Sequence, residues 1–99
     1  MLGLGDRVDG RFELLRRTAV GGTATVFRAL DHATGSEVAL KILRAATSAD
    51  HARAEREARW LAATHDPHVV AFVAAGALGP DQRYLAMEWI AGETLAERF

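Results

Sequence analysis

The sequence predicts a small α+β fold. A chain of 99 residues has room for one domain. Short segments rich in β-branched and aromatic residues, bounded by glycine and turn residues, predict five strands. A longer run without glycine or proline predicts a helix after the third strand. The expected order is therefore three strands, a helix, two strands and the start of a second helix.

Composition limits the classes of function. Hydrophobic residues make up 49% of the chain and charged residues 25%, which is ordinary for a globular protein. The net charge of −1 gives no basic footprint for nucleic acid, and the absence of cysteine excludes disulfides. No signal peptide or apolar run of about 20 residues is present, so we expect a cytoplasmic protein. Composition gives no indication of the oligomeric state, and a membrane tether further along the gene stays open.

The first half of the chain predicts three strands. Residues 1–10 contain three glycines and few apolar anchors, so we expect a flexible leader before a domain that spans 11–99. Two turn signals separate the strands: the pair Gly21–Gly22, and the polar cluster 31–36. The strands are expected at 11–19, 24–30 and 37–43.

The second half predicts a helix and two more strands. Thr47 with Asp50 three residues later is typical of a helix start, and Pro67 ends the helix expected at 49–64. The apolar side chains of this helix recur at helical spacing, at Ala54, Ala58, Leu61 and Ala62. The uniformly apolar segment 69–75 predicts a well-buried strand. A strand at 83–90 and a helix from residue 93 complete the order.

Lys41 is the single lysine of the chain, among eleven arginines. Side chains alternate along a strand, so Ala39 and Lys41 should share one face, with Val38, Leu40 and Ile42 on the other. A small side chain beside a compact ammonium suits a flat apolar ring that carries a phosphate group. The alternative is an ordinary surface lysine on a half-buried strand.

Several motifs occur in an order typical of one family. They are the glycine pair between the first two strands, Val38-Ala39-Leu40-Lys41, Glu57 beside the helix stripe, and Met87-Glu88-Trp89-Ile90 before Gly92. Together they resemble the N-terminal lobe of a bacterial eukaryotic-like (Hanks-type) serine/threonine protein kinase, over about residues 11–99. The resemblance implies a five-stranded antiparallel sheet with one packed helix, and an ATP-binding function.

The resemblance implies a phosphate-binding loop at the glycine pair. The family pattern Gly-x-Gly-x-x-Gly-x-Val falls on residues 19–26, where Gly21 is the only glycine that matches. The loop positions implied to cover ATP are Ala19, Val20, Gly21 and Gly22. Alanine at positions 19 and 24 limits positive φ and weakens the expected clamp on the phosphates. A plain hairpin turn is the alternative.

The remaining site residues are also implied by the resemblance. Lys41 would hold the α- and β-phosphates, and Glu57 would hold Lys41 through an ion pair. On helical spacing alone, Glu57 would instead be a solvated charge beside Arg53 or Arg56. Other implied contacts surround the adenine: Val26 and Ala39 close over the ring, Met87 lies behind it, and the Glu88 carbonyl and Ile90 N–H bond its edge.

Phosphoryl transfer needs groups that this sequence lacks. The family's His-Arg-Asp catalytic loop and the Asp-Phe-Gly that holds Mg²⁺ are absent, and the four histidines show no metal-ligand spacing. We therefore expect Mg²⁺ to bind only together with a catalytic lobe. The chain stops within a predicted helix at Phe99, so we expect a fragment that is inactive alone. The intact parent would bind ATP and phosphorylate a protein substrate.

Two other functions remain open at this point. The missing outer glycines also suit a pseudokinase or a regulatory nucleotide-binding module. A small α+β interaction domain that binds no nucleotide is the third reading.

Overall fold

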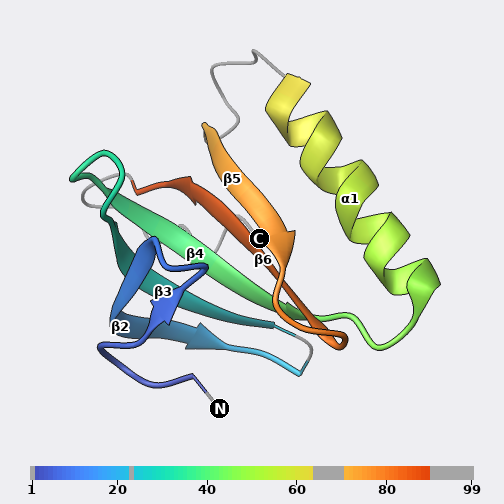
Figure 1. The fold of residues 1–99 in the computed structure, drawn as a ribbon, viewed down its shortest axis with the longest axis horizontal. Coiled ribbons are helices and arrows are strands. Elements are labelled where there is room, and N and C mark those ends of the chain that lie inside the picture. The colour runs from blue at the N-terminus through green and yellow to red at the C-terminus, as the bar shows by residue number, and fades with distance from the viewer. Residues whose placement is uncertain (1, 23, 64–70, 90–99) are drawn as a thin grey trace.

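The computed structural model describes residues 2–22, 24–63 and 71–89. One antiparallel sheet runs through this part of the chain, with a single helix on one side of it (Figure 1). The strands follow the order β1-β2-β3-β4-β6-β5 across the sheet. The elements are β1 (Arg7–Val8), β2 (Phe12–Val20), β3 (Ala24–Asp31), β4 (Glu37–Arg44), α1 (Ser48–Ala63), β5 (Phe72–Ala77) and β6 (Gln82–Glu88). The predicted α+β class is confirmed, while the second helix expected from residue 93 lies outside the described residues.

The sheet has six strands rather than the predicted five. The extra strand, β1, lies within residues 1–10, where we expected a flexible leader, and it pairs Val8 with Phe12. Val8 is 1% exposed, and Asp9 and Gly10 turn the chain back with positive φ angles of 55° and 62°. Strand patterning does not predict β1, because it has only two residues and one apolar anchor.

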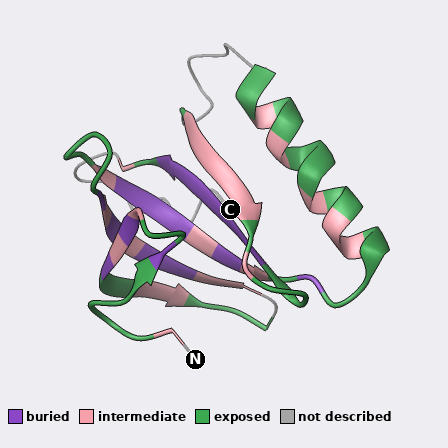
Figure 2. Ribbon diagram, viewed as in Figure 1, coloured by how far each residue is buried: buried purple, intermediate pink, exposed green. Residues whose placement is uncertain are grey.

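One face of the sheet carries the larger apolar core. Its buried members come from five strands, and Figure 2 shows the longest unbroken buried stretch on β6. They are Val8, Phe12, Leu14, Phe27, Ala29, Val38, Leu40, Ile42, Tyr84 and Ala86. Val38, Leu40 and Ile42 lie on this face, as strand alternation predicts.

The opposite face carries a smaller apolar cluster, and α1 packs against it. Its buried members are Val26, Ala39, Leu85 and Met87, and Ala58 and Leu61 of α1 lie against them. No residue of α1 is itself buried. The helix therefore contacts the sheet through residues that stay half-buried, and Figure 2 shows only intermediate and exposed residues along α1.

The start of α1 follows the predicted capping pattern. The hydroxyl of Thr47 accepts a hydrogen bond from the Asp50 N–H at 3.1 Å. The Asp50 carboxylate accepts in return from the N–H groups of Thr47 and Ala46, at 3.3 and 3.2 Å. The side chain of Thr47, and after it the N–H groups of Thr47 and Ala46, lower the pKa of Asp50 because they favour its charged form. The helix therefore begins where the sequence indicates.

The strand predicted at 69–75 differs from the expectation in place and burial. Strand β5 runs from Phe72 to Ala77, and residues 69–70 lie outside the described part of the chain. None of its residues is fully buried. The reason is position: β5 is an edge strand that pairs only with β6, so its apolar composition does not imply a central place in the sheet.

A buried carboxylate organises the turn between β3 and β4. Arg11 donates to both oxygens of Asp31, at 2.7 and 2.8 Å, and Asp31 is 0% exposed. Asp31 also accepts from the Ala33 N–H at 2.9 Å and the Thr34 hydroxyl at 3.2 Å. The turn cluster predicted at 31–36 is thus held from within and tied to the start of β2.

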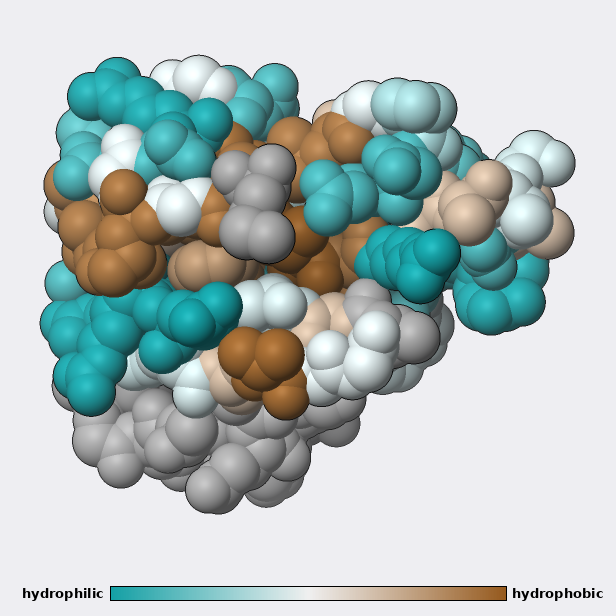
Figure 3. Space-filling model, turned by 90° about the horizontal axis from the view of Figure 1, so that it is seen from below, coloured by the Kyte–Doolittle hydropathy of each residue, from teal (hydrophilic) through white to brown (hydrophobic). Residues whose placement is uncertain are grey.

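The surface shows no single large apolar face in the view of Figure 3, where hydrophilic side chains interrupt the hydrophobic ones. The large apolar side chains that are exposed come from three parts of the chain: Leu4 before β1, Leu15 and Val20 on β2, and Trp60 on α1. Within the described residues, no helix has the length and apolar character needed to cross a membrane.

Candidate functional site

Five of the predicted site residues lie on the same face of the sheet. Antiparallel partners point to the same side, so register alone defines rows of neighbouring side chains. One row runs Arg28–Ala39–Met87 across β3, β4 and β6. The next runs Ala19–Val26–Lys41–Leu85 across β2, β3, β4 and β6. Lys41 therefore lies one row from Ala39 and directly beside Val26.

This face is also the one that α1 covers. Ala58 and Leu61 of α1 pack on the cluster that contains Val26 and Ala39, so Lys41 and the helix share a side of the sheet. Glu57 is exposed. The ion pairs described for α1 join Arg53 to Asp50 and Arg83 to Glu55. Lys41 and α1 lie on the same side of the sheet, which is the side on which the implied pair with Glu57 would form.

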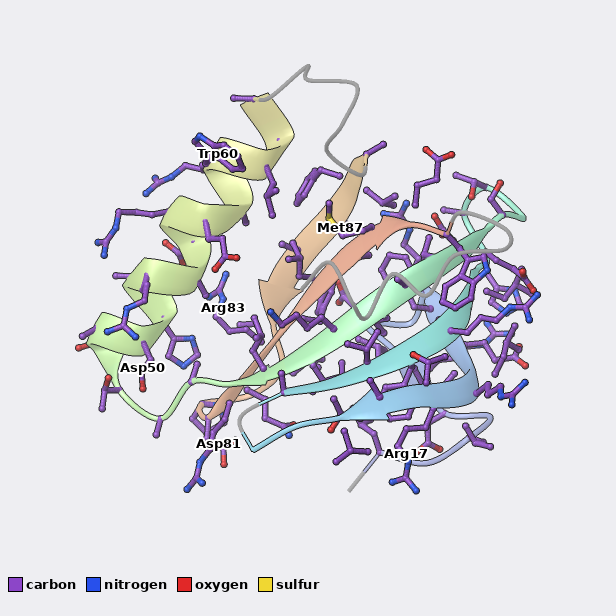
Figure 4. The ribbon with its side chains drawn as sticks, turned by 180° about the vertical axis from the view of Figure 1, so that it is seen from behind. Arg17, Asp50, Trp60, Asp81, Arg83 and Met87 are labelled. Carbon is purple, nitrogen blue, oxygen red and sulfur yellow. The ribbon has the colours of Figure 1, made fainter. Side chains whose placement is uncertain are left out.

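Glu55, rather than Glu57, connects α1 to the sheet. Its carboxylate accepts from the Arg83 guanidinium at 3.4 Å, and Figure 4 shows Arg83 directed from β6 towards the helix. Arg83 Nη1 also lies 3.4 Å from His51 Nδ1, while His51 Nε2 lies 2.9 Å from the Pro80 carbonyl. A carbonyl only accepts, so the ring proton is on Nε2 and Nδ1 accepts from Arg83. Arg83 therefore anchors α1 through two helix side chains.

The glycine pair lies at the tip of the β2–β3 hairpin. Val20 pairs with Thr25, and the Gly21 N–H donates to the Ala24 carbonyl at 2.8 Å. Among the described residues, Asp9 is the only non-glycine with positive φ, so neither Ala19 nor Ala24 is strained. Gly22 has open space where a Cβ would lie. The two alanines that depart from the family pattern therefore fit this backbone without cost.

The predicted adenine edge lies at the end of β6. Met87 is 1% exposed and packs with Ala39 and Val26. The Glu88 N–H donates to the Ala71 carbonyl at 2.9 Å, so this part of β6 is held by the chain that leads into β5. Glu88 itself points away from the Ala39 row, since it pairs with Val38. Ile90 lies outside the described residues.

The residues of this face fit part of ATP. Val26, Ala39 and Met87 form a tight apolar surface with no side-chain bulk at position 39, which suits a flat ring. The ammonium of Lys41, in the adjacent row, suits an anion attached to that ring. Mg²⁺ has no comparable fit: in the described ranges no group of three histidine or acidic side chains is placed to hold a metal ion.

A hollow in the described part of the chain lies away from Ala39 and Lys41. It has a volume of about 540 Å³ and lies where β4 begins and β6 ends. Its lining is Asp31, Thr34, Ser36, Glu37, Val38, Ala71, Phe72, Val73, Glu88 and Trp89. Neither Ala39 nor Lys41 lines it. For a ligand that joins an apolar ring to phosphate groups, the Ala39–Lys41 face is the better candidate. This face offers an apolar surface beside a cation, whereas the hollow carries three carboxylates.

Sequence reasoning missed a cluster at the end of this face. The Arg28 guanidinium donates to the Glu37 carboxylate, with Nε at 3.0 Å, and lies 5.5 Å from the centre of the Trp89 ring. The three residues lie in β3, at the start of β4 and directly after β6. Alternation along β3 could have placed Arg28 on the same face as Val26, but only the register joins it to Trp89.

Comparison with known proteins agrees with this geometry. No family model matches the sequence. The chain is 36% identical over 97 residues to the serine/threonine-protein kinase PrkC of Bacillus subtilis, and 40% identical over 91 residues to pkn2 of Myxococcus xanthus. These matches cover 95% and 89% of the chain. The chain is homologous to the N-terminal lobe of bacterial serine/threonine-protein kinases. PknA of Mycobacterium tuberculosis is a third relative, 34% identical over 93% of the chain.

A solved structure shows the same fold. The apo form of PpkA-294 superimposes on 98% of the chain with a TM-score of 0.76 at 21% identity. The chain covers 41% of that structure. It spans 15%, 11% and 23% of the lengths of PrkC, pkn2 and PknA respectively. The kinase N-lobe therefore matches as a unit, and it accounts for less than a quarter of each of these kinases.

Proposed function

We propose that this chain is the ATP-binding lobe of a serine/threonine protein kinase. The observation that carries the proposal is the shared face of Val26, Ala39, Lys41 and Met87, on the same side of the sheet as α1. In a protein that joins this lobe to a catalytic lobe, the activity would be phosphoryl transfer from ATP to a protein serine or threonine. The homology to bacterial kinases supports that extension.

Each residue would act by position and charge. Val26 and Ala39 would pack on the adenine ring, with Met87 behind it, and the main chain from Glu88 to Ile90 would bond the ring edge. The N–H groups of the Gly21–Gly22 tip would approach the phosphates, because glycine leaves the backbone uncovered. Lys41 would hold the α- and β-phosphates, and Glu57 would orient Lys41 once it turns inwards. When bound with a catalytic lobe, Mg²⁺ would neutralise charge on the phosphates.

The Lys41–Glu57 pair is not needed for folding on this proposal. Glu57 is exposed, and exposed ion pairs contribute about 0–1 kcal/mol to stability. The role of the Lys41–Glu57 pair would be to orient the Lys41 ammonium towards the phosphates. Phosphoryl transfer also needs a base and metal-binding residues that the sequence does not contain, so the 99-residue chain should bind ATP weakly and transfer nothing.

The test is a titration of the isotope-labelled 99-residue chain with ATP, followed by amide NMR. We expect shifts at Val26, Ala39, Lys41 and Met87, and little change at Leu14 and Val38, which belong to the opposite core. The methyl signals of Val38 and Ala39 are an internal control, since adjacent side chains on a strand report on opposite faces.

A matched pair of variants separates the site from general electrostatics. Lys41→Ala should abolish the ATP-dependent shifts while changing the free energy of unfolding by less than about 1 kcal/mol. Arg7→Ala removes one positive charge from an exposed position on the edge strand β1 and should leave the shifts in place. ATP-dependent shifts that survive in Lys41→Ala would overturn the assignment of Lys41. If the wild-type chain shows no shifts at the highest ATP concentration, the proposal that it binds a nucleotide is wrong.

A further inference from the structure

Arg28, Glu37 and Trp89 form a cluster, called here the Arg28 cluster, at one edge of the candidate site. The cluster connects β3, the start of β4 and the residue after β6. Arg28 donates to Glu37 Oε2 through Nε at 3.0 Å and through Nη2 at 2.5 Å. Its guanidinium also lies over the Trp89 ring, 5.5 Å from the ring centre. The Trp89 N–H donates to the Glu37 carbonyl at 3.4 Å. Trp89 is thus held twice, through its ring by Arg28 and through its main chain by Glu37.

The cluster lies on the same face as the candidate adenine surface. Arg28 is the register partner of Ala39, and Ala39 is the partner of Met87. Trp89 follows Met87 by two residues, which returns its side chain to the same side of the chain. Trp89 also packs against the cluster of Val26, Ala39, Leu85 and Met87. The bonds of Arg28 therefore reach the chain immediately after Met87, where the adenine edge is proposed to bind.

These contacts contribute little to stability, so their expected role is to orient Trp89. The side chains of Arg28 and Glu37 are 39% and 36% exposed, which limits the contribution of their ion pair to stability. A planar guanidinium can donate to a carboxylate and stack on an aromatic ring at once, which an ammonium does not reproduce. Arginine at position 28 is thus suited to hold Trp89 at a fixed angle.

We propose that Arg28 is a positioning residue for the nucleotide base: by bonding Glu37 and stacking on Trp89, it fixes the main chain after Met87 that receives the adenine. This inference rests on the proposed ATP-binding function. It adds a residue on β3 that does not itself contact the phosphates. Loss of Arg28 should weaken binding of the base and leave binding of the phosphates unchanged.

The experiment compares two ligands, ATP and inorganic tripolyphosphate, by NMR titration of the 99-residue chain. Arg28→Leu should raise the dissociation constant for ATP by about threefold to tenfold, the range expected when one cation–π contact and one ordered side chain are lost. It should leave the constant for tripolyphosphate unchanged. Arg28→Lys keeps the charge but lacks the planar fork, so it should resemble Arg28→Leu, whereas Trp89→Phe keeps a ring and should bind ATP nearly as wild type does.

Two controls make the outcome decisive. Arg17→Leu removes a positive charge from an exposed site on β2, at the far side of the sheet from α1 in Figure 4, and should change neither ligand's affinity. The indole N–H signals of the two tryptophans report the contact without ligand: Arg28→Leu should move the Trp89 signal and not that of Trp60, which is 62% exposed.

The possible failures differ from one another. Equal weakening of ATP and tripolyphosphate by Arg28→Leu would make Arg28 a general attractor of anions and overturn the inference. Unchanged ATP affinity in Arg28→Leu would overturn the inference alone and leave the nucleotide site intact. Absence of ATP binding in the wild-type chain would overturn the proposed function, and the inference with it.

Discussion

Ala39 of β4 lies directly opposite Met87 of β6, and the two side chains are 0% and 1% exposed. Both residues pack in the same cluster as Val26. A larger side chain at position 39 would occupy the place where the proposed adenine ring would pack. The relation between these residues therefore makes the size of residue 39 a direct test of the site.

We predict that Ala39→Val abolishes ATP-dependent NMR shifts. The extra methyl groups also overpack a filled position, so the free energy of unfolding should fall by about 1–3 kcal/mol. Ala29→Val is the matched control, because Ala29 is also 0% exposed in a central strand but belongs to the opposite core. It should lose similar stability in urea unfolding and keep the ATP response. Equal ATP responses in the two variants would place the nucleotide elsewhere.

Sequence patterns predicted the features that depend on residues close together in the chain. Alternation along β4 correctly placed Ala39 and Lys41 on one face and Val38, Leu40 and Ile42 on the other. The capping pair Thr47 and Asp50 located the start of α1. In each case the signal lies within a few residues, where backbone geometry alone decides which side chains meet.

The features that the sequence did not predict depend on contacts between distant residues. Strand β1 is held partly by the Tyr84 hydroxyl, which donates to Asp9 across 75 positions of the chain. The contact of Arg28 with Trp89 requires the register of three strands. The choice of Glu55 over Glu57 as the contact with Arg83 depends on how α1 is rotated on the sheet, and helical spacing leaves that rotation open.

The Arg11–Asp31 pair should make the fold sensitive to acid. Arg11, followed by the Ala33 N–H, lowers the pKa of Asp31, although burial of the carboxyl opposes the shift. A folded pKa below the unfolded one means that the stabilisation is present above about pH 4 and is lost as the pH falls further. Asp31→Ala should cost about 2–3 kcal/mol at neutral pH, towards the lower end for a broken buried pair, since Arg11 is partly exposed.

Urea unfolding at a series of pH values measures this effect. The midpoint of the wild-type chain should fall steeply below about pH 4, and that of Asp31→Asn should fall less, because asparagine has no carboxylate to protonate. Parallel acid profiles for wild type and Asp31→Asn would show that other carboxylates dominate acid unfolding.

Gly76 leaves room for the ring of Tyr84. A Cβ at position 76 would lie 3.0 Å from Tyr84 Cε1 and 3.1 Å from its hydroxyl oxygen. The ring cannot withdraw easily, because Phe12 lies 5.7 Å from it and Asp9 holds its hydroxyl. Gly76→Ala should therefore destabilise the chain by about 1–3 kcal/mol. A double-mutant cycle with Tyr84→Leu checks the cause: the double variant should cost clearly less than the sum of the single changes, and additivity would contradict the steric account.

Tyr84, the only tyrosine of the chain, should make stability fall at high pH. Burial, and then its hydrogen bond to Asp9 at 2.7 Å, raise its pKa to about 12 from the usual value of 10.0. The folded state thus keeps the phenolic proton longer than the unfolded state does. The stabilisation from this group is fully present below about pH 10, and it declines as the pH rises towards about 12.

Tyrosinate absorbance gives a direct measurement, because no other residue contributes to it. The native chain should ionise well above a model tyrosine, and urea-unfolded chain should ionise near the model value. Tyr84→Phe should remove the stability loss above about pH 10 while costing about 1–2 kcal/mol at neutral pH through the lost bond to Asp9. That bond connects β6 to the turn after β1, so the same variant should speed amide exchange at Val8. Normal ionisation of Tyr84 in the folded chain, or unchanged exchange at Val8, would show that the contact with Asp9 does not hold β1 in solution.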